Sequence, residues 1–283
     1  MKIGLVLSGG MVRGALQIGA LKAIREYLAP SEIEVFSCAS IGALNGYAFA
    51  TDRLKELEAL WLSVCADNSR LFINRAVKCS LFQSTVDRLY VPGDKLPGEF
   101  YIPLLNFKEK AVEYTNISAV PSEMYPTYLR AGVSMPIYSK SIQIGSNFYN
   151  DGAFVDNTPI FPLYEKSLDY ILCIYFDDCN TSFENEAFDR KVVKLPLPLK
   201  KLFTETFVLN KAEVTEMIAR GYDATKRTLE IVFKNGTQDV DFIRSVSALL
   251  DKGEPKNYRV TGDIVVRNLY KVTKQIAKRK VLL

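Results

Sequence analysis

The chain has 283 residues, of which 48% are hydrophobic and 24% are charged, and its formal net charge is +4. This composition is ordinary for a folded globular protein and excludes fibrous, collagen-like and disordered chains. The sequence contains no histidine, which excludes a Ser-His-Asp triad, a Cys-His pair and a His-ligated metal. Proton transfer near neutral pH therefore requires a carboxylate, lysine, tyrosine or cysteine.

The cysteine content indicates neither a disulfide framework nor a zinc site, because the number is odd and no pair has CxxC spacing. The five cysteines are Cys38, Cys65, Cys79, Cys173 and Cys179. We therefore expect a reducing, cytoplasmic location. The apolar run at residues 2–7 is too short for the core of a signal peptide. No stretch reaches the length of about 18 apolar residues that crosses a bilayer.

The first part of the chain alternates predicted strands and helices. Residues 2–7 form a buried strand, followed by a glycine-containing turn at residues 8–14 and an amphipathic helix that ends at Pro30. A second strand at residues 33–38 runs into a small, apolar helix, and a further helix begins near Asp52. This order favours a mainly parallel sheet with helices on both faces.

The rest of the chain is less regular and is predicted to become helical toward its end. The expected elements are loops and short helices over residues 66–110, a strand at 112–119, a hairpin at 141–150, a buried strand at 168–176, a mobile loop at 178–200 and mostly helices from 201 onward. No internal repeat or linker divides the chain. We therefore expect a single domain over residues 1–283, with a motif-bearing core at about 2–176 and a helical part at about 201–283.

Ser40 is a candidate nucleophile. It lies between a predicted buried strand and a helix, with Ala39 and Gly42 as small neighbours. This is typical of a nucleophile elbow, where a tight turn excludes bulky side chains and leaves the serine oxygen exposed. The usual pattern is Gly-x-Ser-x-Gly, and Cys38 stands at its first position. The alternative is a helix N-cap, a common role of serine at such a junction.

A glycine-containing loop, Gly9-Gly10-Met11-Val12-Arg13-Gly14, joins the first strand to its helix. Such a loop can direct backbone N–H groups at an anion, aided by the helix N-terminus. It is neither a dinucleotide fingerprint, which needs glycine where Met11 stands, nor a P-loop, which needs Lys and Ser/Thr after Gly14. The alternative is a tight turn without a ligand. An oxyanion hole is favoured only if Ser40 lies beside the loop, as expected for adjacent ends of parallel strands.

Asp151 is a candidate base. It follows the predicted hairpin directly, in Asn150-Asp151-Gly152-Ala153. Asp-Gly is more often a turn than a site, because both residues tolerate turn geometry. A chain without histidine nevertheless needs a base for Ser40, and Asn157 is placed to anchor the following loop through its side chain.

The three motifs, in this order and at this spacing, resemble the patatin-like phospholipase family from Leu7 to about Phe176. The matching positions are Gly9, Gly10, Arg13 and Gly14 in the family's Gly-Gly-Gly-x-Arg-Gly loop, residues 38–42 at its elbow, and Asp151, Gly152 and Ala153 at its Asp-Gly-Gly/Ala motif. Met11 and Cys38 depart from the pattern by replacing glycines. Arg13 is interpreted as ordering its loop, meeting an anionic head group or forming a surface salt bridge.

The resemblance implies an α/β three-layer sandwich with a mainly parallel central sheet and a Ser–Asp dyad without histidine. Ser40 would attack a carboxylic ester of a phospholipid or related acyl lipid, Asp151 would take its proton, and water would then cleave the acyl-enzyme. Backbone N–H groups of Gly10 and Met11, with Gly9, would hold the oxyanion. No metal or organic cofactor is implied. Because free aspartate titrates near pH ~3.9, the acid limb of kcat/KM is expected at about pH 4–6.

The C-terminal segment, residues 264–283, is basic and free of acidic residues. Its cations are Arg267, Lys271, Lys274, Lys278, Arg279 and Lys280. On a helix, most of them share one face, opposite an apolar face. Such a helix can make peripheral contact with an anionic membrane surface. The favoured alternative is a terminal helix docked by its apolar face, and we expect no nucleic-acid partner.

Two functions from different classes remain open. The leading interpretation is an esterase that acts on acyl lipids. The alternative is a lipid-binding or regulatory protein on the same fold that has lost turnover through Met11 and Cys38. Acyl-carrier-protein transacylases, which have a related fold, normally rely on histidine, and this chain has none. Labelling of Ser40 by a fluorophosphonate separates the two leading interpretations.

Overall fold

The computed structural model describes residues 1–64, 71–72, 81–136, 139–176, 186–200, 208–209, 211–253 and 278–282. Its strands are β1 (Ile3–Leu7), β2 (Ile33–Cys38), β3 (Leu71–Phe72), β4 (Glu99–Asn106), β5 (Ala111–Asn116), β6 (Ile142–Ile144), β7 (Asn147–Asp151), β8 (Tyr170–Phe176), β9 (Val192–Leu197), β10 (Val208–Leu209) and β11 (Lys278–Leu282). Its α-helices are α1 (Gly14–Arg25), α2 (Ile41–Ala50), α3 (Leu54–Val64), α5 (Leu81–Leu89), α6 (Tyr125–Gly132), α7 (Glu186–Asp189), α9 (Lys211–Val232) and α10 (Val240–Gly253). Short 3-10 helices are η1 (Met11–Arg13), η2 (Pro30–Glu32), η3 (Ile117–Ala119), η4 (Ser122–Met124), η5 (Gly152–Phe154) and η6 (Phe161–Leu163).

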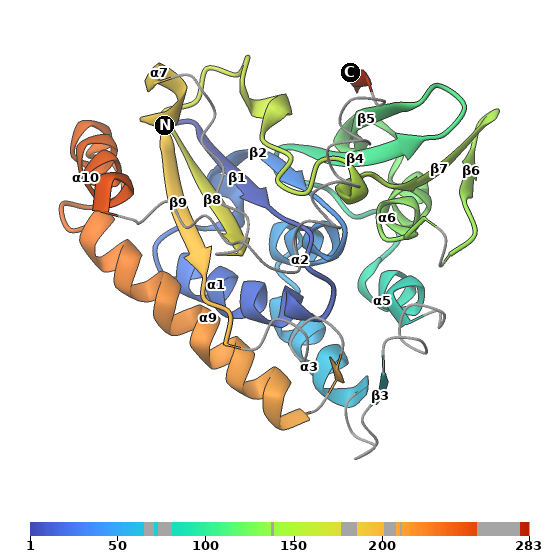
Figure 1. The fold of residues 1–283 in the computed structure, drawn as a ribbon, viewed down its shortest axis with the longest axis horizontal. Helices are drawn as coiled ribbons and strands as arrows, with labels where there is room; N and C mark the ends of the chain where they lie inside the picture. The colour runs from blue at the N-terminus through green and yellow to red at the C-terminus, as the bar shows by residue number, and fades with distance from the viewer. Residues whose placement is uncertain are drawn as a thin grey trace, which may run out of the picture.

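A central sheet organises the fold (Figure 1). Within the described residues it has nine strands, in the order β11-β5-β4-β2-β1-β8-β9, with β7 paired to β4 and β6 paired to β7. The run from β4 through β2, β1 and β8 to β9 is parallel, as is the pair of β11 and β5. Antiparallel pairs join β4 to β5, β4 to β7 and β6 to β7. The predicted α/β class with a mainly parallel central sheet is confirmed.

The two faces of the sheet are covered differently. Successive side chains of a strand point to opposite faces, so Leu5 and Leu7 belong to one hydrophobic core and Val6 to the other. Helices α1, α2 and α9 contribute to the larger core and lie together on one side of β1, β8 and β9 (Figure 1). The smaller core is closed by the segment at 155–168 and by Phe188 of α7. In the described part of the chain, no helix combines the length and apolar composition needed to cross a membrane.

Strand β4 occupies a region that the sequence predicts to be loops and short helices. That prediction is wrong for Glu99–Asn106, which pairs with β2 in parallel and with β5 and β7 in antiparallel fashion. The strand contains Pro103, and proline is usually confined to strand edges and bulges because it lacks an N–H group. Its other residues are almost continuously buried, so the alternation that marks a half-exposed strand is missing.

Two predictions for the last third of the chain are corrected. The sequence predicts a mobile loop over 178–200, but Glu186–Asp189 forms α7 and Val192–Leu197 forms β9, which pairs in parallel with β8. It also predicts helix to the end of the chain, but Lys278–Leu282 forms β11, parallel to β5. The prediction of a basic amphipathic helix is therefore wrong for its last residues, because they pair with a sheet edge. The rest of that predicted helix, 264–277, lies outside the described residues.

Candidate active site

Ser40 lies at the turn between β2 and α2, in a strained backbone conformation. Its φ is 53° and its ψ is −128°, a region that costs a non-glycine residue about 1–3 kcal/mol and persists where the surroundings enforce it. Ala39 donates its N–H to the Leu7 carbonyl at 2.9 Å, and a β-carbon at Gly42 would lie 2.7 Å from the Ser8 carbonyl oxygen. Within the described residues, the Ser40 side chain makes no capping hydrogen bond to α2, which disfavours the N-cap interpretation.

Cys38 fits at the first elbow position because a glycine faces it from α2. A β-carbon at Gly46 would lie 2.6 Å from the Cys38 Sγ, so the helix leaves room for the thiol only by lacking a side chain there. Cys38 is fully buried, and burial raises the pKa of its thiol well above the ordinary value. A buried, protonated thiol of this kind packs as a small apolar side chain rather than reacting as a nucleophile.

Strand β4 brings Asp151 level with Ser40. Ser37 of β2 lies opposite Tyr101 of β4, and Asp151 of β7 lies opposite Leu104, three residues further along the same strand. Strand β5 pairs with one edge of β4. Strands β2 and β7 therefore pair with the opposite edge, β2 along residues 99–101 and β7 along residues 104–106. Ser40 likewise lies three residues beyond Ser37, so Ser40 and Asp151 lie at about the same distance along β4.

The carboxylate of Asp151 is enclosed and hydrogen-bonded. Asp151 is 3% exposed, its Oδ1 accepts the Ala153 N–H at 2.9 Å, and the Ser40 side chain lies near enough to its carboxylate to influence its pKa. Burial raises the pKa of Asp151 to about 7, against the lowering influence of the nearby Ser40 side chain and of the Ala153 N–H. A carboxyl group with a pKa near 7 is suited to take up and return a proton at neutral pH.

The backbone around Asp151 is fixed by Ser134, which follows α6. The Ser134 carbonyl accepts the Asp151 N–H at 2.8 Å and the side-chain amide of Asn150 at 2.9 Å. A β-carbon at Gly152 would lie 2.5 Å from the Pro103 carbonyl, so only glycine allows the chain to pass β4 here. Ser134 carries no motif, and sequence reasoning did not identify it.

The loop after β1 lies directly against both motifs. A β-carbon at Gly9 would lie 2.5 Å from the Asn157 side-chain oxygen, 3.0 Å from the Ser40 β-carbon and 3.1 Å from the Ala153 β-carbon. Asn157 also holds Gly9 from both sides: its carbonyl accepts the Gly9 N–H at 3.0 Å, and its side-chain amide donates to the Gly9 carbonyl at 3.1 Å. Asn157, which the sequence indicates as a loop anchor, thus makes its hydrogen bonds to Gly9.

Of the three predicted oxyanion donors, Gly9, Gly10 and Met11, one has its N–H engaged by the protein. The Gly9 N–H already donates to Asn157, so Gly9 has no N–H to offer a substrate. Among the described residues, no backbone carbonyl accepts from the N–H of Gly10 or of Met11. Met11 adopts a φ of 55°, so it takes a conformation that favours glycine despite its side chain.

Arg13 stabilises the same loop. Its Nε donates to the Gly10 carbonyl at 3.2 Å, and its guanidinium lies 4.4 Å from the centre of the Phe176 ring. A β-carbon at Gly10 would come within 2.2 Å of that ring. Of the three roles considered for Arg13, these contacts favour loop ordering.

A buried polar network connects this loop to the helix that follows Ser40. Gln17 of α1 donates its side-chain amide to the Ser8 carbonyl at 2.6 Å. Asn45 of α2 donates to the Gln17 side-chain oxygen at 2.8 Å and to the Gly14 carbonyl at 2.9 Å. Gln17 and Asn45 are both fully buried. Sequence reasoning did not single them out, although an amide within an apolar helix is the kind of signal that indicates such a network.

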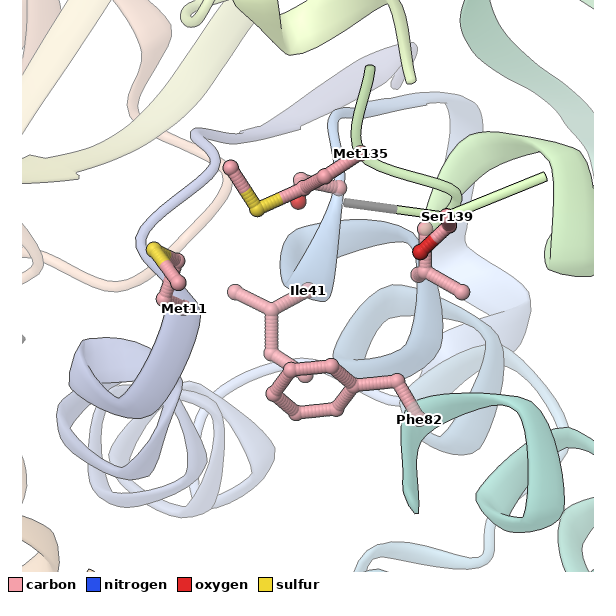
Figure 2. A pocket seen from close by; sticks show the side chains of 7 residues that line it. Met11, Ile41, Phe82, Met135 and Ser139 are labelled. Atoms are coloured by element: carbon pink, nitrogen blue, oxygen red, sulfur yellow. The ribbon is translucent and has the colours of Figure 1, made fainter. Parts of the chain in front are cut away.

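A small pocket opens beside Ser40 (Figure 2). It is lined by Met11, Ser40, Ile41, Phe82, Val133, Met135 and Ser139. Its walls come from the loop after β1, the start of α2, α5 and the segment after α6. Five of the seven lining residues have apolar side chains, and Ser40 and Ser139 add hydroxyl groups. The pocket can therefore hold an alkyl group next to a polar one.

A comparison with known families identifies the part of the chain in which these residues lie. The family model described as patatin-like phospholipase matches residues 5–164, more than half of the chain. The chain belongs to the patatin-like phospholipase family. The matched region of this patatin-like chain contains the loop after β1, the Ser40 elbow and Asp151, which the structure brings together.

Curated relatives of the patatin-like chain include two fungal proteins. Lysophospholipase NTE1 of Cryptococcus neoformans is 27% identical over 198 residues, and lysophospholipase nte1 of Aspergillus terreus is 25% identical over 192 residues. Each alignment covers 61% of this chain but only 11% and 12% of the respective relative. VipD from Legionella pneumophila has a similar fold, with a TM-score of 0.50 and 12% identity, over 80% of this chain and 66% of that one.

Proposed function

We propose that this chain is a lipid acyl hydrolase that cleaves carboxylic esters of phospholipids or related acyl lipids. In this proposal Ser40 forms the acyl-enzyme and Asp151 is its base. The observation that carries the proposal is the convergence of the Ser40 elbow and the buried Asp151 carboxylate beside the loop after β1, where Gly9 packs against the β-carbons of both Ser40 and Ala153. Membership of the patatin-like phospholipase family and the lysophospholipase relatives support the substrate class.

The first step forms the acyl-enzyme. As the Ser40 Oγ attacks the ester carbonyl carbon, its proton passes to the Asp151 carboxylate. The carbonyl oxygen becomes an oxyanion, to which the Gly10 and Met11 N–H groups donate; losing one such donor typically costs about 3 kcal/mol of transition-state stabilisation. When the intermediate collapses, the C–O bond to the alcohol breaks. Asp151 returns its proton to the leaving oxygen.

The second step releases the acyl group. Water attacks the acyl carbon and gives a proton to Asp151, the same N–H groups hold the new oxyanion, and the Ser40 oxygen leaves with the proton from Asp151. The products are a free carboxylic acid and regenerated enzyme. One carboxyl group thus acts as base and acid in turn, for which a pKa near the working pH is favourable.

A fluorophosphonate probe combined with product analysis tests this proposal. We expect the probe to label Ser40 and phospholipid, lysophospholipid or short acyl esters to yield free acid. A second candidate function, lipid binding without turnover, is suggested by Met11, whose positive φ strains the proposed oxyanion loop. Binding of lipid with neither labelling nor acid release would favour that second function. Absence of both labelling and acid release would contradict the esterase.

We also propose that the protein works in a reducing, cytoplasmic compartment. Among the described residues, Cys38 and Cys173 are free, buried thiols. Quantifying free thiols in protein isolated under alkylating conditions tests this, because a disulfide in the native protein would contradict it.

A further inference from the structure

Met11 presents a side chain from a backbone conformation that suits glycine. Its φ of 55° lies in the left-handed region, which costs an L-residue about 1–2 kcal/mol and glycine almost nothing. The side chain is nevertheless directed into the wall of the pocket beside Ser40 (Figure 2). Replacing this side chain by a hydrogen atom would therefore leave the loop conformation accessible while removing part of the pocket wall.

The pocket is too small for an acyl chain as it stands. Its volume is about 20 Å³, which is room for about one water molecule. Ile41 and Val133 are 2% and 6% exposed and belong to the close-packed core, so they can move little. Met11 and Met135 are only partly buried, and unbranched thioether side chains with three rotatable bonds adapt more readily. A substrate must therefore displace partly buried lining side chains, above all the two methionines, rather than the core side chains.

We propose that Met11 and Met135 form a thioether gate beside Ser40 that limits the acyl group to short chains, with Met11 as the main determinant of chain length. The inference rests on the proposed function, because a gate of this kind acts on an acyl group transferred to Ser40. A short acyl chain needs only a small displacement of the two side chains. A long chain must displace them fully or leave its distal methylenes in water, which forfeits about 0.8 kcal/mol for each methylene left unburied.

The test compares two soluble esters that share one leaving group, p-nitrophenyl butyrate and p-nitrophenyl laurate, below the concentration at which either aggregates. For the wild-type chain we expect kcat/KM to be higher for butyrate. Met11→Gly should raise the laurate-to-butyrate ratio of kcat/KM by about tenfold or more, since a few methylenes in an apolar pocket are worth at least that factor. The ratio is the readout because butyrate alone reports any general loss of rate.

Three matched variants separate pocket volume from other effects. Met11→Leu keeps the bulk and the demand for a positive φ, so the short-chain preference should remain. Met135→Ala should raise the ratio in the same direction as Met11→Gly. Met124 is 37% exposed in η4 and is not part of the pocket lining, so Met124→Ala should leave the ratio unchanged.

The outcomes distinguish failure of the gate from failure of the proposed function. If Met11→Gly and wild type both hydrolyse the two esters with the same laurate-to-butyrate ratio of kcat/KM, the gate is overturned. The proposed esterase activity then stands. A wild-type chain that prefers laurate overturns the gate as well. If neither ester is cleaved and a fluorophosphonate does not label Ser40, the proposed function fails and the gate falls with it.

Discussion

The side-chain amide of Asn45 donates a 2.8 Å hydrogen bond to the side-chain oxygen of Gln17, which in turn donates to the Ser8 carbonyl. Helix α2, which begins directly after Ser40, is thereby tied to the loop that carries Gly10. Both amides are fully buried, so water cannot replace a lost partner. The network fixes the position of the proposed oxyanion donors relative to the proposed nucleophile.

Replacing Gln17 by leucine should therefore weaken both folding and catalysis. Gln17→Leu leaves the Ser8 carbonyl and one N–H of Asn45 without partners, at about 1–3 kcal/mol of unfolding free energy for each group. We expect kcat for butyrate hydrolysis to fall more than KM changes, because the loop bearing the donors loses its anchor. Urea unfolding and steady-state kinetics measure the two effects. Gln143→Leu, the same change at an exposed glutamine, should alter stability by less than about 0.5 kcal/mol.

Ser40→Ala should abolish ester hydrolysis and fluorophosphonate labelling while the thermal midpoint changes little. Ser40 contributes a proposed nucleophile and little core packing, and alanine keeps the β-carbon that faces Gly9. Ser139 also lines the pocket, so Ser139→Ala is the matched control and should retain both activities. Wild-type hydrolysis by Ser40→Ala would show that another group is acylated.

The sequence could indicate the candidate site residues because each lies in a short local motif. The elbow around Ser40 and the Asp-Gly pair at Asp151 are recognisable from neighbouring residues, and the absence of histidine narrows the choice of base. Their convergence depends on β4, whose Pro103 and near-continuous burial conceal it in the sequence. The register of β2 and of β7 along β4 determines how close Ser40 and Asp151 come. Such register depends on residues far apart in the sequence.

The contacts of the proposed oxyanion loop and the pKa of Asp151 were less accessible to sequence reasoning. Gly9 matches the family's loop, yet its N–H is taken by Asn157, 148 residues away along the chain. The predicted acid limb at about pH 4–6 assumes an aspartate with some contact to water. The burial that raises the pKa of Asp151 to about 7 arises from packing around β4, β7 and the elbow, which no local pattern records.

Asp151→Asn should abolish hydrolysis and change how stability depends on pH. The raised pKa means that the folded chain retains this proton up to about pH 7, whereas the unfolded chain releases it near pH ~3.9. Between these values the wild-type unfolding free energy should fall as pH rises, by up to about 4 kcal/mol from this group alone. Asparagine carries no such charge, so the variant should gain stability relative to wild type on going from pH 4 to pH 8. Urea unfolding at both pH values measures this, and Asp156→Asn in the same loop, at a partly exposed residue, is the control.

The acid limb of kcat/KM should lie near pH 7, above the range that an exposed aspartate would give. Asp151 must be ionised to accept the Ser40 proton, so activity should fall as pH drops through the raised pKa of about 7. The chain has no histidine to titrate there, and burial raises the pKa of the Cys173 thiol to about 12, outside this range. Butyrate release from a soluble ester, quantified chromatographically, avoids the pH-dependent absorbance of p-nitrophenol. Fluorescence of Trp61, the single tryptophan, checks that the fold persists across the same range. A limb below about pH 5 would mean that the carboxylate ionises despite its burial, and the loss of any limb would point to a different base.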